Sequence, residues 1–211
     1  FAGPLGIFTS QSRARGPSEP FADLDIDSDS ISVGLTLRHP IYRTPTTELA
    51  LFASVEYRQN ETTILGENFS FDIGAENGKS RVFPLRFGQD FSYASPTGAW
   101  AFAARSVFTL GTDWFTGNAG ERQVDAQGKP LPFADAQFFA WQGQLQYIRK
   151  LDNRNNRLIL RGGAQLADDS LLSIEQFSLG AVGSVRGYRE NRVVRDQGLT
   201  GTAVCVVSAD T

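Results

Sequence analysis

The sequence predicts an all-β protein, and more narrowly a part of an antiparallel transmembrane β-barrel. Three observations lead to this fold class. Apolar and polar residues alternate with a period of two along six segments, and a seventh candidate strand begins near Gly198. Short and long connections between these segments alternate without a break. The segments are also about nine residues or longer, which suits a tilted strand that crosses a hydrocarbon layer.

The first three predicted strands occupy residues 31–38, 49–58 and 83–93. In the first strand, one face carries Ile, Val and Leu, and the other carries Ser, Gly, Thr and Arg. The second strand follows the same rule except at Phe52, which falls on the polar face. In the third strand Pro84 is an objection, because proline cannot donate a hydrogen bond to a ladder. That strand either starts after Pro84 or is bulged there.

The remaining predicted strands occupy residues 100–110, 139–150 and 157–166, followed by the one that begins near Gly198. The last of these is apolar on both faces over residues 203–207. Aromatic residues lie near several strand ends, as the interfacial girdle of a membrane barrel requires. They are Tyr57, Tyr93, Trp100, Phe138, Phe139 and Tyr147.

Alternation alone fits two architectures, because a soluble β-sandwich also has one apolar and one polar face. The connections favour the barrel. Residues 40–47, 95–98 and 152–156 form short turns, whereas 60–80, 113–136 and 168–197 form long loops, and residues 1–30 are a long leading segment. Soluble strands are also shorter, at about 5–6 residues.

The composition argues against several other classes of protein. The net charge of -3 and the isoelectric point near 5.2 disfavour a nucleic-acid binder. The single cysteine, Cys205, excludes an internal disulfide framework, and the single histidine, His39, supports neither a catalytic triad nor a zinc site. No run of 18 apolar residues is present. We therefore expect no enzyme activity, no metal and no cofactor.

The chain begins with Phe1, contains no methionine and stops inside a predicted strand. We therefore expect an internal fragment of a longer chain.

The connection at residues 168–197 is too long and too apolar for a plain surface loop. Phe177, Leu179, Val182, Val185 and Tyr188 all need shelter from water, and a loop that folds back into a barrel lumen supplies it. The same loop contains a short charged motif that consists of Val185, Arg186, Gly187, Tyr188, Arg189, Glu190 and Asn191.

The residues Val185-Arg186-Gly187-Tyr188 resemble the V/I-R-G-F/Y signature of a superfamily of outer-membrane barrels. This superfamily contains the outer-membrane protein assembly factor and the TpsB transporters of two-partner secretion, which export haemolysins or adhesins. The continuation through Asn191, with Asp196 and Gly198, is more similar to TpsB. The lead-in at residues 177–180 also fits, although Ala181 departs from the second glycine often found there.

The resemblance implies a sixteen-stranded barrel in which the signature loop joins strands eleven and twelve and folds into the lumen. The strand at 31–38 is then the sixth, and residues 1–30 form an outer loop. Residues 1–211 are expected to be part of a C-terminal barrel domain, with N-terminal periplasmic modules and the last strands outside this chain. Arg186 is expected to pair with an acidic residue on a strand beyond Thr211.

The function implied by the resemblance is secretion of a large, unfolded partner exoprotein across the bacterial outer membrane by a monomeric barrel. The alternatives are an assembly factor of the same superfamily, a passive porin and a soluble β-sandwich binding module. In the barrel, polar faces of the strands line the lumen. The candidate lumen-facing residues are Arg86, Asp90, Arg105, Gln142, Gln144, Gln146, Arg157 and Arg161.

Overall fold

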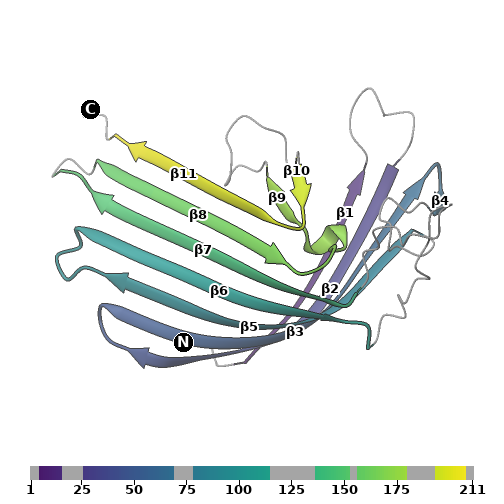
Figure 1. Ribbon diagram of the computed structural model, residues 1–211, viewed down its shortest axis with the longest axis horizontal. Helices are drawn as coiled ribbons and strands as arrows, with labels where there is room; N and C mark the ends of the chain where they lie inside the picture. Colours follow the sequence, from purple (N-terminus) through teal and green to yellow (C-terminus); the bar gives the residue numbers. More distant parts are fainter. Residues whose placement is uncertain are drawn as a thin grey trace.

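The computed structural model describes residues 5–15, 26–68, 78–114, 136–152, 156–179 and 193–207. Within these ranges nine strands form one curved antiparallel sheet (Figure 1). The long strands follow one another across the sheet in chain order, which confirms the predicted antiparallel fold. They are β1 (Leu5–Arg15), β2 (Ile26–Arg43), β3 (Thr47–Ile64), β5 (Lys79–Ala94), β6 (Trp100–Thr112), β7 (Phe138–Lys150), β8 (Arg157–Ala167) and β11 (Gly198–Val206). The short β4 (Glu67–Asn68) pairs with the end of β3.

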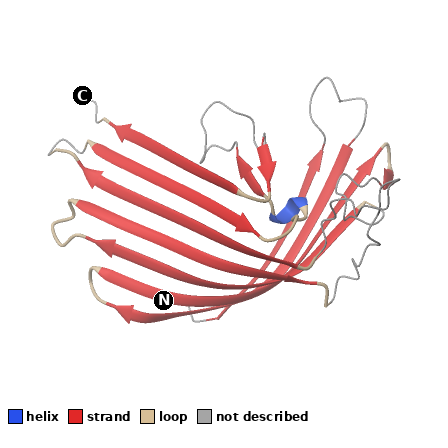
Figure 2. Ribbon diagram, viewed as in Figure 1, coloured by secondary structure: helices blue, strands red, loops and turns tan. Residues whose placement is uncertain are grey.

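The connection from β8 to β11 has structure of its own. It contains the 3-10 turn η2 (Ser173–Glu175), then β9 (Phe177–Leu179) and β10 (Val193–Arg195). β9 and β10 pair in a separate antiparallel ribbon. In Figure 2, η2 is the helical turn beside the end of β8. Among the described residues, no helix is long and apolar enough to cross a membrane.

The strands begin earlier and extend further than the sequence predicts. Residues 5–15, interpreted as part of an outer loop, form β1 and pair with β2 along their whole length. The sequence interpretation failed there because Leu5 and Ile7 are the only apolar residues on the relevant face of β1. β2 and β3 also continue through residues 26–30 and 59–64, so the loops around them are shorter than predicted. Residues 40–43, predicted as part of a short turn, also lie within β2.

Pro84 does not end a strand, because β5 runs from Lys79 to Ala94 through it. On one side Pro84 lies opposite Gly111 of β6. On the other side, the pairing with β3 is interrupted between Leu85 and Val82 and resumes in the same register. Because proline has no N–H group to donate, the sheet lacks hydrogen bonds at this point, but the register of the two strands does not change. At the far end, β11 pairs with β8 as far as Val206.

One face of the sheet carries a broad apolar belt of exposed side chains. Cross-strand pairing aligns apolar residues of six consecutive strands in one row, which consists of Ile7, Leu35, Val55, Leu85, Leu110 and Phe139. All of these except the half-buried Leu85 are among the exposed large hydrophobic residues. An exposed apolar surface of this extent is typical of a membrane or partner interface and not of a free soluble surface.

The belt has recognisable borders. Near the short turns, the ring of Trp100 lies 4.8 Å from that of Tyr93 and 6.1 Å from that of Tyr147, as expected for an aromatic girdle. Beyond Tyr57 the same face becomes polar, with Lys79 paired to Glu61. Phe138 is not part of the girdle, because it is buried on the opposite face.

Candidate functional site

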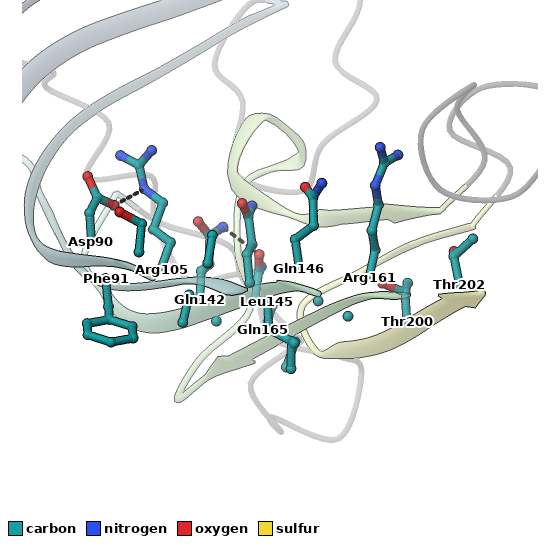
Figure 3. Close-up of a pocket in the computed structure, with 18 of the residues that line it drawn as sticks. Asp90, Phe91, Arg105, Gln142, Leu145, Gln146, Arg161, Gln165, Thr200 and Thr202 are labelled. Atoms are coloured by element: carbon teal, nitrogen blue, oxygen red, sulfur yellow. Dashed lines mark hydrogen bonds and ion pairs between the residues drawn. The ribbon is translucent and has the colours of Figure 1, made fainter. Parts of the chain in front are cut away.

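The opposite face of the sheet is polar, and all eight candidate residues lie on it. Residues that lie directly opposite each other on neighbouring strands share a face of the sheet. Five of the eight candidate residues are connected in this way, in two rows. One row runs Asp90–Arg105–Gln144 and another runs Gln146–Arg161. Arg86, Gln142 and Arg157 occupy the same face by the alternation along β5, β7 and β8. In Figure 3 the side chains of Asp90 and Arg105 project from one side of the sheet, whereas Phe91 projects from the other.

Four charged side chains form a closed ring at the centre of this face. Glu56 and Arg58 come from β3, Arg86 from β5 and Glu175 from η2. The Arg58 Nη1 and the Arg86 Nη2 each lie 2.8 Å from the Glu175 Oε1, and Arg86 also donates to the second oxygen at 2.8 Å. Glu56 closes the ring by pairing with both arginines. Two positive and two negative charges therefore balance one another.

The ring attaches the β8–β11 connection to the sheet. We call residues 170–179 and 193–197 of this connection the loop root. The contacts are long-range, since Glu175 is 117 residues from Arg58 and 89 from Arg86 in sequence. Arg58 also donates to the carbonyl oxygen of Ile174 at 3.1 Å, so backbone and side chain of η2 are both held.

A buried apolar cluster beside the ring, which we call the apolar seat, completes the attachment. Leu171 and Leu172 of the loop root are buried in a cluster with Val82 of β5 and with Phe138 and Ala140 of β7. Gly111 lies directly opposite Phe138 and leaves room for its ring. A Cβ atom at position 111 would collide with that ring and with the carbonyl oxygen of Ala136. Burial of each leucine side chain contributes roughly 1.5–3 kcal/mol to the free energy that holds the loop root on the sheet.

Two polar side chains tie the ends of the loop root together. The buried Gln165 of β8 donates to the carbonyl oxygens of Glu175 at 3.1 Å and Asp196 at 3.2 Å. The Asp196 carboxylate accepts from the Leu171 N–H at 3.0 Å and from the Gln176 Nε2 at 2.8 Å. Hydrogen bonds thus close the connection on itself before the chain enters β11 at Gly198, against which the Phe177 ring packs.

The rest of the polar face remains an open trough on the side of the short turns. It is lined by Arg38, Asp90, Arg105, Gln144, Gln146, Arg161, Thr200 and Thr202. Phe52, the exception in the alternation of β3, lies beside the trough over Gly88, and the Arg105 guanidinium stacks 4.5 Å from the centre of its ring. Figure 3 shows Gln146 and Arg161 pointing into this trough.

The charged motif of the loop falls outside the described residues, as do Val182 and the other members of residues 180–192. The structure therefore describes the two flanks of the motif, and both flanks belong to the loop root on the polar face. The predicted roles of Val185, Arg186, Gly187, Tyr188, Arg189, Glu190 and Asn191 stay predictions.

Sequence reasoning missed the residues that hold the loop root. Arg86 was a candidate, but its partner Glu175 was not, and neither were Leu171 and Leu172. The one local signal is the pair of adjacent leucines followed by an acidic residue at the start of a loop. Such a pattern indicates a buried loop, but it does not say where the loop docks.

A sheet with an apolar belt on one face and a docked loop on the other defines a class of protein. It is part of the wall of a transmembrane β-barrel. The family model of the haemolysin secretion/activation protein ShlB/FhaC/HecB matches residues 5–200, and the chain belongs to this family. These proteins are TpsB transporters of the outer membrane and not enzymes, as the sequence predicts.

The fold is similar to that of a solved structure, CdiB from Acinetobacter baumannii. The TM-score is 0.71 at 14% sequence identity, over 98% of this chain and 34% of that chain. This chain thus spans about a third of the length of CdiB. A comparison with curated protein sequences gave no match.

Proposed function

We propose that this chain forms part of the wall of an outer-membrane pore that secretes a large partner exoprotein in unfolded form. The observation that carries the proposal is the pairing of an exposed apolar belt with an opposite polar face on which the chain's own loop is docked. A belt in lipid and a polar lumen are the two faces of a transporting barrel. Membership of a family that secretes partner exoproteins supplies the cargo class.

We place the chain in a C-terminal barrel domain of sixteen strands, with periplasmic modules before it and further strands after it. In that arrangement β2 is the sixth strand, β1 is the fifth, and the β8–β11 connection joins the eleventh and twelfth. The match to 34% of CdiB supports a partial barrel of this size. We propose a single barrel as the functional unit.

The eight polar residues named from the sequence are proposed to line the pore, and the motif at 185–191 is proposed to lie within it. The attachment of both flanks of this motif to the polar face supports that location. Arg186 has a forked set of donors suited to a bidentate carboxylate. We propose that it braces the loop against an acidic partner on the barrel wall.

Secretion of the cognate exoprotein by the complete transporter in bacterial cells tests this function. We expect Arg186→Ala to reduce the exoprotein in the medium while the barrel still inserts. Arg13→Ala is the matched control, since Arg13 pairs with Asp29 outside the polar face. Normal secretion by Arg186→Ala at normal protein level would refute the role of Arg186.

The same cells separate the alternatives. A passive porin would give a steady ion conductance that does not depend on Arg186. An assembly factor would leave exoprotein export unchanged on deletion while the levels of other outer-membrane barrels fall.

A further inference from the structure

We propose that Glu175 is a positioning residue, and that the ring of Glu56, Arg58, Arg86 and Glu175 is a latch that holds the loop root against the wall of the pore. The proposal rests on the proposed function in one respect, namely that the polar face lines the pore. It concerns the loop root alone and is independent of the charged motif.

The sheet alone supplies three of the four members of the latch. Glu56 and Arg58 are on one strand and Arg86 is on its neighbour, so the sheet itself brings two guanidinium groups and one carboxylate together. Without Glu175 this patch has one uncompensated positive charge. The loop supplies the missing carboxylate from a distant part of the sequence.

Burial makes this contact stronger than an ordinary surface ion pair. The Glu175 side chain is 5% exposed and that of Arg86 is 16% exposed, whereas that of Arg58 is 35% exposed. Charge-assisted hydrogen bonds to a shielded carboxylate are stronger than those between neutral groups. Since Arg58 is partly exposed, water reaches one side of the ring. Glu56, Arg58 and Arg86 line a second hollow of the polar face, which adjoins the open trough at Asp90 and Arg105.

The apolar seat makes the latch separable from folding. Leu171 and Leu172 are buried in a cluster with Val82 and Phe138 that does not include residue 175. A neutral residue of the same shape at position 175 therefore removes the charge contact while the sheet and the seat are kept. Release of the latch frees the part of the loop root that covers the pore wall at β3 and β5, so it is expected to widen the pore.

Single-channel recording of the complete transporter in planar bilayers tests the proposal, with Glu175→Gln, Glu175→Asp, Arg86→Gln and the double variant Glu175→Gln/Arg86→Gln. We expect Glu175→Gln to raise the ratio of open to closed time about tenfold, which corresponds to ~1.4 kcal/mol. Glu175→Asp keeps the carboxylate and should restore most of the wild-type behaviour. The double variant should do no more than the stronger single change, because both single changes remove the contact between Arg86 and Glu175.

Glu61→Gln is the matched control, since Glu61 pairs with Lys79 on the other face and should leave the currents unchanged. Hydrogen–deuterium exchange of residues 170–176 in the same preparations should rise in Glu175→Gln and not in Glu61→Gln. Wild-type currents and wild-type exchange in Glu175→Gln would overturn the latch, as would effects of Glu175→Gln and Arg86→Gln that simply add.

Two further outcomes are a variant that fails to insert and a wild-type protein that exports no exoprotein. If Glu175→Gln does not insert, Arg58→Gln decides by the same two measurements, because Arg58 reaches the same carboxylate from a more exposed position. If the wild-type protein conducts but exports no exoprotein, the proposed function fails, while the currents and the exchange still decide on the latch.

Discussion

The polar face has two halves that are built from similar strands but meet different surroundings. The covered half, over β3, β5 and the start of β7, lies under the loop root. The open half, over β6, β7, β8 and β11 toward the short turns, faces an empty trough. Each half contains an arginine that forms an ion pair with an acidic residue. Arg86 is 16% exposed between two carboxylates, whereas Arg105 is 50% exposed and 3.5 Å from Asp90.

Burial under the loop root, and not residue type, decides how much a charged residue on this face contributes to stability. In the covered half each charge has a fixed partner and an apolar neighbour, so removal of one group leaves another stranded. In the open half Arg105 is half exposed and Gln144 is exposed, so single changes there should alter the free energy of unfolding little. Matched substitutions in the two halves test this difference.

The largest expected effect comes from the arginines themselves. Arg86→Leu leaves Glu56 and Glu175 without their shared cation and should destabilise the docked loop root by about 3–5 kcal/mol. Arg105→Leu, its counterpart in the open half, should cost less than about 1 kcal/mol. Hydrogen exchange of residues 170–176 in lipid nanodiscs measures both. Equal loss of protection in the two variants would erase the distinction between the halves.

A smaller effect is expected from the apolar seat. Leu172→Ala removes a fully buried side chain and should destabilise the loop root by about 2–4 kcal/mol, partly through the cavity it leaves. Leu65→Ala is the matched control, because Leu65 is exposed at the end of β3 and touches no part of the seat. Exchange of the Leu171 to Gln176 amides should increase in the first variant only. Unchanged protection in Leu172→Ala would mean that the seat is not formed in the membrane.

The glycine beneath Phe138 should give the next effect. A methyl group at Gly111 would meet the Phe138 ring and a backbone carbonyl, so Gly111→Ala should cost about 1–3 kcal/mol. Gly201→Ala provides the comparison, since a Cβ atom there enters open space. Thermal unfolding of the inserted protein should show a lower midpoint for Gly111→Ala and little change for Gly201→Ala. A reversed order would show that Phe138 does not pack where the structure places it.

The smallest effect belongs to the glutamines. Gln165 is buried and bonds two loop carbonyls, so Gln165→Ala should weaken the loop root by about 1–2 kcal/mol. Gln144→Ala removes an exposed side chain of the trough and should change stability by less than about 0.5 kcal/mol. The same exchange experiment separates them. An equal cost for both would mean that Gln144 has a partner in the complete barrel.

The sequence predicts the two faces of the sheet well because the signal is local. Alternation along each strand is sufficient to assign the side of Phe52, Arg86 or Gln144, with no knowledge of the partners. β1 was missed because Gln11 and Thr9 replace apolar residues on its belt face, which weakens the alternation.

The loop root could not be predicted in the same way. Glu175 meets Arg86 across 89 residues of sequence, and no periodic pattern connects them. Phe138 looked like a girdle residue from its place at a strand end, and its true side depends on the exact start of β7. A shift of one residue moves a side chain to the other face of the sheet.

In the complete barrel we expect the polar face to line a water-filled pore and the apolar belt to face lipid. Labelling of single cysteines along β7 with a membrane-impermeant maleimide tests it most directly, in the complete transporter with Cys205→Ala. We predict that Gln144→Cys and Gln146→Cys react, while Leu145→Cys and Tyr147→Cys on the belt do not. Equal reaction at all four positions, or reaction at 145 and 147 alone, would contradict the assignment of the two faces.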